Sequence, residues 1–169
     1  MKIIEAMKQA KDLLRKADDL VEKIKKNCVL TSVETPAYPD QKVQVSEWLQ
    51  AHSDVVKEIL RLRTAIQRTN ISTPVTIELG GKQVTKSIAE WIQRRKDLAS
   101  LEFKAWNSLN DRGIKEGTTQ GPSGTPIDIK VIRYYDPKVR DEKLDLFSSE
   151  PALIDGKLEI VNAVTDLIE

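Results

Sequence analysis

Few side chains in this sequence are suited to nucleophilic or general-base catalysis. His52 is the one histidine and Cys28 the one cysteine. Both fall on apolar stripes of predicted helices, where a histidine is more often satisfied inside an interface than active as a base. Nucleophilic catalysis needs a nucleophile beside a base, and a structural zinc site needs a cluster of Cys and His ligands. We therefore predict no catalytic residue, no metal site, no cofactor and no internal disulfide.

Two charged residues interrupt an otherwise apolar helical stripe. Arg95 and Glu102 lie seven residues apart in a helix predicted over residues 87–109. One interpretation is a buried ion pair, formed by Glu102 with Arg95 or with an arginine of a partner chain, that fixes the register of a helical assembly. The other is that the two residues belong to a functional site. The sequence leaves both interpretations open.

Arginines recur beside the predicted connections between elements. Arg68 ends the second predicted helix and Arg95 lies in the third. Arg112 precedes a glycine-rich loop, and Arg133 stands next to Tyr134. An arginine fork matches phosphate or carboxylate oxygens, and a tyrosine ring can stack on a base. For each arginine alone, a solvated salt bridge is the competing interpretation. We expect five side chains to converge at one end of the bundle, namely Arg68, Asn70, Arg95, Arg112 and Arg133.

The glycine-rich loop, residues 117–124, contains hydroxyls and backbone N–H groups that could face an anion. It lacks the GxxxxGK[ST] spacing of a P-loop, and it precedes a strand, whereas a P-loop joins a strand to a helix. Two interpretations remain, a flexible surface loop and a lid over a small ligand. The full set of predicted ligand-binding residues is Arg68, Asn70, Thr73, Arg95, Arg112, Thr118, Thr119, Ser123, Arg133 and Tyr134.

The charge balance argues against large polyanionic partners. The 27 basic and 26 acidic side chains leave a formal net charge of +1, so no whole-chain field attracts DNA, RNA or an anionic membrane. The apolar runs are far shorter than the roughly 20 residues that span a bilayer, and the N-terminal stretch lacks the apolar core of a secretory signal. We predict a cytoplasmic location, in the host cytoplasm if the chain is phage-encoded, with no nucleic acid and no membrane as partner.

Two apolar stripes in alternating steps of four and three predict an antiparallel α-hairpin over residues 1–69. Pro36 and Pro39 mark the connection between its helices, and Ser46 is a candidate cap for the second. The first stripe consists of Ile3, Met7, Ala10, Leu14, Ala17, Val21, Ile24 and Cys28. The second consists of Trp48, His52, Val55, Ile59, Leu62 and Ile66, widened by Leu49, Val56 and Leu60.

The remaining sequence predicts smaller elements. A tight turn at Gly80 and Gly81 predicts a β-hairpin over residues 74–86. The inward stripe of the 87–109 helix is expected to carry Ile88, Ile92, Ala99, Phe103 and Trp106. A polar loop (110–126), a strand (127–135) and a C-terminal helix (137–168) kinked near residues 149–151 follow. The predicted fold class is mainly α with small β (α+β), in a single domain over residues 1–169.

Four short motifs carry a family resemblance that covers nearly the whole chain. They are IQRTN at 66–70, Thr73 with the Gly81-Lys82 turn, SIAEWIQRR at 87–95, and NAVTDLIE at 162–169. With these motifs the sequence resembles the septicolysin-like family of small, mostly uncharacterised bacterial and phage proteins. It departs from that pattern in its longer glycine-rich loop and in Val164, where the family is expected to carry a tryptophan. The family name suggests a pore-forming toxin, but the sequence provides no membrane-inserting segment.

These observations support three functional hypotheses. The first is a non-catalytic homo-oligomer, with a hexamer as one candidate, that holds a small anionic nucleotide-like ligand between chains. By analogy with small phage oligomers, such a protein acts as a sponge for immune signalling nucleotides. The second is a structural or interaction protein whose apolar stripes are themselves the function. The third is a hydrolase, for example a phosphodiesterase acting on such nucleotides.

Overall fold

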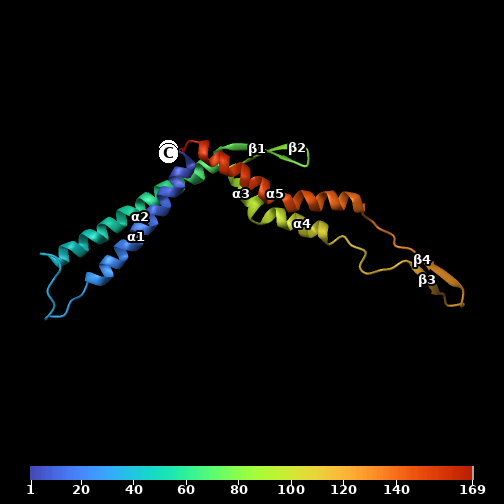
Figure 1. Cartoon of the computed structure of the whole chain (residues 1–169), viewed down its shortest axis with the longest axis horizontal. Coiled ribbons are helices and arrows are strands. Elements are labelled where there is room, and N and C mark those ends of the chain that lie inside the picture. The colour runs from blue at the N-terminus through green and yellow to red at the C-terminus, as the bar shows by residue number, and fades with distance from the viewer. Residues whose placement is uncertain (169) are drawn as a thin grey trace. The chain divides into compact units, whose positions relative to one another are not determined.

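The computed structural model describes residues 1–168 and separates into two compact units. Unit 1 comprises Met1–Pro74, Ser87–Ala89 and the segment from Leu158 onward, and unit 2 comprises Val75–Lys86 and Glu90–Lys157. The elements are mainly helices with two small β-hairpins (Figure 1), which confirms the predicted fold class of mainly α with small β. No feature of the sequence pattern predicts the division into two units.

Unit 1 is built on an antiparallel α-hairpin, which confirms the prediction for residues 1–69. Helix α1 (Ile3–Asn27) packs along α2 (Gln41–Ser72). The cap of α2 is Asp40, whose carboxylate accepts a hydrogen bond of 3.0 Å from the Val43 N–H. The suggestion of Ser46 as the cap is wrong because the helix begins five residues earlier than that serine.

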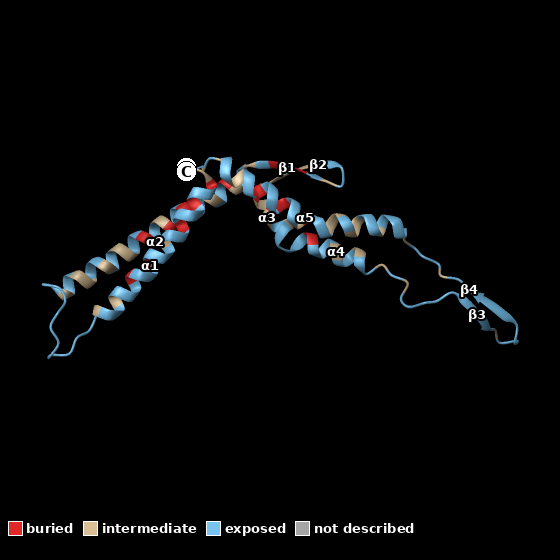
Figure 2. Cartoon of the chain, viewed as in Figure 1, coloured by how far each residue is buried: buried red, intermediate tan, exposed pale blue. Residues whose placement is uncertain are grey.

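The contact between α1 and α2 uses only part of the predicted seam on α1. Two clusters of buried side chains lie along the hairpin (Figure 2): Ala6, Ala10 and Leu62, and Ala17, Leu20, Val55 and Ile59. Met7, Leu14 and Val21, which the prediction placed in the seam, are 50%, 40% and 47% exposed. Ile3, Ala10 and Ala17 belong equally to a second three-four stripe through Ala6, Leu13 and Leu20. The small alanines of that second stripe let α2 approach closely, so α2 packs on it.

The C-terminal segment closes the open end of this hairpin. The Ile168 N–H donates to the Thr69 hydroxyl at 2.8 Å, and the Leu167 N–H donates to the Met1 carbonyl at 2.8 Å. Lys2 pairs with Asp166 at 2.9 Å, and its hydrogen bond lowers the pKa of the Asp166 carboxyl. The C-terminal helix therefore ends at Val164 rather than at residue 168, because these last residues form a bridge with the N-terminus.

A short β-hairpin precedes the third helix. Strands β1 (Pro74–Leu79) and β2 (Lys82–Ser87) flank Gly80 and Gly81, which have φ of 56° and 75°. These left-handed values are the reason for glycine at both positions of the turn. The prediction of a hairpin around this Gly-Gly pair is confirmed.

The predicted helix 87–109 is helical but not uniformly α. It consists of α3 (Ile88–Gln93), a π-helical segment (Arg94–Leu98) and α4 (Ala99–Asn107). A π segment adds a residue to the turn and so changes which side chains face inward after it. Of the predicted inward stripe, Ile88 and Ala99 are buried and Ile92, Phe103 and Trp106 are half-buried, whereas the fully buried Trp91 is absent from the prediction.

The polar loop is partly ordered as a second hairpin. Strands β3 (Gly117–Gln120) and β4 (Pro126–Ile129) pair antiparallel, with Thr118 opposite Asp128. The predicted absence of regular structure over 110–126 is wrong in part, and the predicted strand 127–135 ends early. All residues of both strands are exposed (Figure 2). Hydrogen bonding between strands, rather than a hydrophobic core, defines this hairpin.

The C-terminal helix α5 (Pro137–Val164) is continuous and contains Pro151. The proline lacks an N–H donor, yet the helix continues past it, as the unbroken three-four rhythm predicts. The buried residues Ile154 and Leu158 follow Pro151 in that rhythm. The kink near residues 149–151 stays a prediction.

Candidate functional site

The π-helical segment places Arg94, and not Arg95, in a buried ion pair. The Arg94 guanidinium donates to both carboxylate oxygens of Glu150, with Nε to Oε1 at 2.7 Å and Nη2 to Oε2 at 2.6 Å. Glu150 is 1% exposed, and Glu102 lies 3.8 Å from Arg94 as a second carboxylate. The hydrogen bond to Glu150 raises the pKa of Arg94. This pair joins α5 to the helix of residues 88–107 within unit 2.

Arg95 forms an ion pair, but its partner is not the Glu102 considered from the sequence. Its guanidinium binds Asp155 at 2.7 Å, and both side chains are exposed, at 41% and 59%. The pairing of Arg95 with Glu102 is therefore wrong. Arg94, three residues after the buried Trp91, faces inward in its place. Glu150 is absent from the sequence prediction, and its position four residues before the buried Ile154 was the signal that placed it on the inner face of α5.

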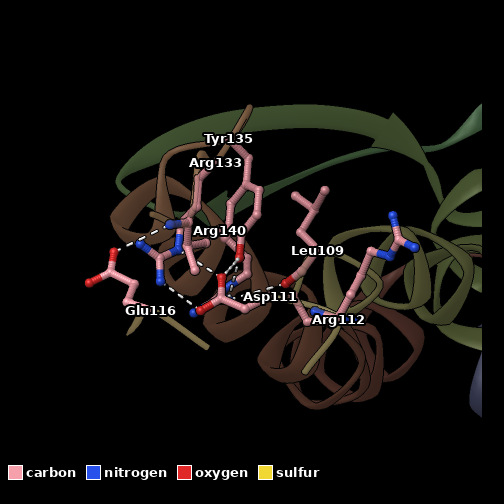
Figure 3. A network of polar contacts seen from close by, with 9 residues as sticks. Leu109, Asp111, Arg112, Glu116, Arg133, Tyr135 and Arg140 are labelled. Carbon is pink, nitrogen blue, oxygen red and sulfur yellow. Dashed lines mark hydrogen bonds and ion pairs between the residues drawn. The ribbon is translucent and has the colours of Figure 1, made fainter. Parts of the chain in front are cut away.

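A second polar network joins the end of α4 to the start of α5 (Figure 3). Arg133 binds both oxygens of Asp111, at 2.7 Å from Nε and 2.6 Å from Nη2, and the Tyr135 hydroxyl donates to Asp111 at 3.2 Å. Arg140 donates to the Leu109 carbonyl at 3.1 Å. The hydrogen bond from Arg133 lowers the pKa of Asp111, and the same bond raises the pKa of Arg133. We call Asp111, Arg133, Tyr135 and Arg140 the clasp.

The clasp changes the roles expected for several predicted ligand residues. Arg133 is committed to Asp111, so its fork is not available to a ligand unless that pair opens. Tyr135 joins the network, whereas the predicted Tyr134 is 96% exposed. Arg112 has φ of 55°, its N–H donates to the Asn110 side chain at 2.7 Å, and its guanidinium points away from the clasp (Figure 3).

The hydroxyl residues of the predicted lid lie on the β3–β4 hairpin. Thr118 donates to Asp128 at 3.3 Å, and Ser123 shares a hydrogen bond of 2.7 Å with Thr125. Thr119 is exposed in β3. These contacts stabilise the hairpin itself, and closure over a ligand stays a prediction.

A groove on α2 gathers cationic side chains on one helix face. The spacing of Lys57, Arg61, Thr64 and Arg68, in steps of four, three and four, places them on one side of the helix. The groove has a volume of about 470 Å³ and is lined by Lys57, Leu60, Arg61, Thr64, Ala65 and Arg68. We call it the basic groove. No carboxylate is among its lining residues in the described part of the chain.

The cations of the basic groove differ in what they already bind. Lys57 contacts Asp54 at 3.1 Å, and Arg61 binds Glu58 through Nη2 at 2.8 Å and Nε at 3.0 Å. The Arg68 side chain is exposed and forms no ion pair within residues 1–168. It is therefore the cation of the groove most available to an anion.

The other predicted residues of unit 1 lie near the end of α2. Thr73 is a backbone partner, since its N–H donates to the Thr69 carbonyl and its carbonyl accepts from the Ile88 N–H, each at 3.0 Å. The side-chain oxygen of Asn70 is buried and has no hydrogen-bond partner among the described atoms. Arg68, Asn70 and Thr73 fall in unit 1, whereas the other predicted ligand residues fall in unit 2. Their convergence at one end of a bundle stays a prediction.

Thiol, imidazole and metal chemistry have little geometric support. Cys28 is exposed at the end of α1 and contacts the Lys25 carbonyl at 3.6 Å, so its predicted place in the seam is wrong. His52 is half-buried on α2. Over residues 1–168, no three His, Cys, Asp or Glu side chains are grouped so that they could hold a metal ion. Within the same range, no helix has the length and apolar character needed to cross a membrane.

Comparison with known proteins places the chain in a family. Residues 10–167 match a family described as "Family of unknown function (DUF6847)". The chain belongs to this family. A similar fold is found in a functionally unknown conserved protein from Corynebacterium diphtheriae, with a TM-score of 0.57 and 20% sequence identity over 99% of both chains. No curated protein matches the sequence. The septicolysin-like resemblance of this DUF6847 protein stays a prediction.

Proposed function

We propose that this DUF6847 protein is a non-catalytic, self-associating protein that binds a small anionic ligand of the nucleotide class. The observation that carries the proposal is the basic groove, in which Arg68 is exposed and unpaired among the described residues. The proposal places a phosphate group of the ligand at Arg68, because the Arg61 fork is already bound to Glu58. Arginine forks bind phosphate oxygens through two parallel hydrogen bonds, which gives them an advantage over single point charges.

The size and lining of the basic groove support a ligand of this class. Its volume of about 470 Å³ lies within the range of about 300–1,000 Å³ that is usual for small-molecule sites. Leu60 adds apolar surface beside the cations, which suits a ligand that carries both a flat apolar base and phosphates. The Thr64 hydroxyl adds a donor and acceptor for a sugar or phosphate oxygen.

The non-catalytic part of the proposal follows from the chemistry of the same lining. Guanidinium and ammonium groups stabilise a bound oxyanion, but hydrolysis also needs a group that activates water. His52, the sole imidazole, is not among the lining residues. Retention of the intact ligand is the expected outcome, and sequestration of a signalling nucleotide, as in a phage sponge, is the biological role that we propose for it.

The test measures nucleotide binding by thermal shift and calorimetry. The purified protein is mixed with ADP-ribose, cyclic dinucleotides and inorganic phosphate in turn. A ligand at 100 times its dissociation constant adds about 2.7 kcal/mol to the stability of the folded state. Arg68→Ala is expected to remove most of the gain, while the matched control Arg63→Ala, also on α2 but outside the groove lining, retains it. Absence of any shift for the wild-type protein would refute the proposal.

Two further measurements separate binding from its alternatives. Recovery of the intact nucleotide after heat denaturation supports sequestration, whereas recovery of hydrolysed product supports the hydrolase. Arg112→Ala extends the test to unit 2, and unchanged affinity in that variant removes Arg112 from the proposed ligand set.

A structural or interaction protein is the second candidate function, and the exposed apolar side chains of the α-hairpin favour it. Leu49, Val56 and Leu60 are 54%, 48% and 67% exposed. If nucleotides fail to bind while the protein self-associates, this second function is the better explanation.

A further inference from the structure

Six of the exposed apolar side chains of unit 1 lie on one face of the α1–α2 hairpin. Met7, Leu14 and Val21 recur every seven residues on α1, to one side of the stripe that packs on α2. Leu49, Val56 and Leu60 lie to the corresponding side of the buried stripe on α2. When two helices pack antiparallel, side chains that are rotated from the contact stripe by the same angle and in the same sense lie on the same face of the pair. We call these six residues the apolar face.

A groove at the loop end of the hairpin supports this geometry. It has a volume of about 420 Å³, and its lining includes Cys28 and Val45. Cys28 follows Val21 by seven residues, and Val45 precedes Leu49 by four. The apolar stripes of α1 and α2 therefore continue to the walls of the same groove, as they must if both lie on one face.

The chain exposes more surface than its mass requires. The accessible surface is 12129 Å² for 19.1 kDa, whereas a compact monomer of this mass exposes about 8,400 Å². Two separately compact halves would expose about 10,100 Å² by the same scaling. The excess of roughly 2,000 Å² thus does not depend on how the two units are placed, and it exceeds the roughly 800 Å² that each partner contributes to a standard interface.

We propose that the apolar face binds the same face of a second copy of this chain, with the two α1 helices antiparallel about Leu14. This deepens the self-association in the proposed function by naming the surface and the partner. With α1 at 25 residues, each copy offers a face about 37 Å long and two helices wide, which amounts to about 750 Å² and is close to a standard interface.

The apolar residues are self-complementary in this arrangement. A two-fold axis at the level of Leu14 brings Met7 of one copy opposite Val21 of the other. In the hairpin, Ala17 packs near Val55 and Ala10 packs near Leu62. The level of Leu14 on α1 therefore corresponds to the part of α2 between Val56 and Leu60, and the two-fold axis crosses α2 there. An interface with two-fold symmetry must match its own surface in this way.

The charges beside the apolar face select a second copy over an unrelated partner. Lys11 and Asp18 are exposed on α1 and form no ion pair within residues 1–168. They lie on the outer side of Leu14, one before it and one after it. The antiparallel arrangement places Lys11 of each copy opposite Asp18 of the other, so the axis generates two ion pairs. A parallel arrangement would instead place like charges together.

Charge reversal tests the partner and the register together. The dimer dissociation constant is measured by sedimentation equilibrium for the wild type, Lys11→Glu, Asp18→Lys and the double variant. Each single reversal replaces two attractive pairs by two repulsive pairs and is expected to weaken the dimer about tenfold. The double variant restores opposite charges across the axis and is expected to return to the wild-type value. Circular dichroism checks that the exposed substitutions leave the fold intact.

Leu14→Glu is the second variant, because it places two like charges at the axis and is expected to yield single chains with unchanged helix content. A wild-type protein that sediments as one chain at high concentration overturns the proposal. So do single reversals that leave the dissociation constant unchanged, or a double variant that is not restored. None of these measurements contains a nucleotide, so failure of the ligand proposal leaves the dimer result intact, and the reverse also holds.

Discussion

Removal of the Glu150 carboxylate charge is expected to destabilise unit 2 strongly. Glu150 is 1% exposed and accepts two charge-assisted hydrogen bonds from Arg94, at 2.7 and 2.6 Å. Breaking a buried pair by removing one partner costs about 3–5 kcal/mol, because the remaining charge stays desolvated. Arg94 is 20% exposed and keeps Glu102 at 3.8 Å. We therefore expect Glu150→Gln to cost about 3 kcal/mol, at the lower end of that range.

The assay is urea denaturation followed by circular dichroism, with a thermal melt beside it. A loss of about 3 kcal/mol corresponds to a fall in Tm of about 6–12 °C for a chain of this size. Asp155→Asn is the matched control, since it removes a carboxylate on the same helix from an exposed pair with Arg95. Exposed pairs contribute about 0–1 kcal/mol, so the control should differ little from the wild type.

A double variant separates desolvation from packing. Arg94→Met combined with Glu150→Leu replaces the pair by apolar side chains, and such replacements are often neutral or stabilising. We expect the double variant to recover most of the stability that Glu150→Gln loses. If Glu150→Gln costs no more than Asp155→Asn, the pair is not desolvated in solution and the reasoning is refuted.

Three further perturbations test separate parts of the structure. Arg133 lowers the pKa of Asp111 below its value in the unfolded chain, so the stabilisation by this pair is present above about pH 4 and is lost as the pH falls through the folded-state pKa. Asp111→Asn should remove this acid dependence of stability, and it should speed proteolysis of residues 112–132 at neutral pH. Gly81→Ala, at φ of 75°, should cost about 1–2 kcal/mol in a thermal melt, and no loss would contradict the left-handed turn. Ala17→Glu buries a charge in the hairpin core and should abolish much of the helical signal, whereas Leu14→Glu should preserve it; equal losses would contradict the assignment of faces.

Local sequence patterns were sufficient to predict those elements whose conformation depends on residues close together in the sequence. The α-hairpin follows from two long three-four stripes separated by Pro36 and Pro39, and the first β-hairpin follows from the adjacent Gly80 and Gly81. The helix through Pro151 follows from an unbroken apolar rhythm on both sides of the proline. In each case the pattern that predicts the element is local, although the packing of α1 on α2 joins residues as distant in sequence as Ala10 and Leu62.

The candidate site was less predictable because it depends on partners distant in sequence. Arg133 is a reasonable anion ligand by residue type, but Asp111, 22 residues earlier, occupies its fork. Arg95 was expected to face inward, but Arg94 takes that place through its pair with Glu150, 56 residues later. Arg68 retains an unpaired guanidinium in the described chain, and nothing in its local sequence distinguishes it from the other arginines.

The sequence by itself determined the helical character, the hairpin turns and the apolar stripes, since these depend on helix periodicity and on backbone conformations that glycine and proline permit or forbid. Only the tertiary structure decided which of two overlapping stripes on α1 packs against α2, because Ile3, Ala10 and Ala17 belong to both. Close approach at the alanines buried the stripe through Leu13 and Leu20 and left Met7, Leu14 and Val21 exposed. Periodicity fixes the angle between side chains on a helix, whereas the choice of buried face depends on the shape of the partner.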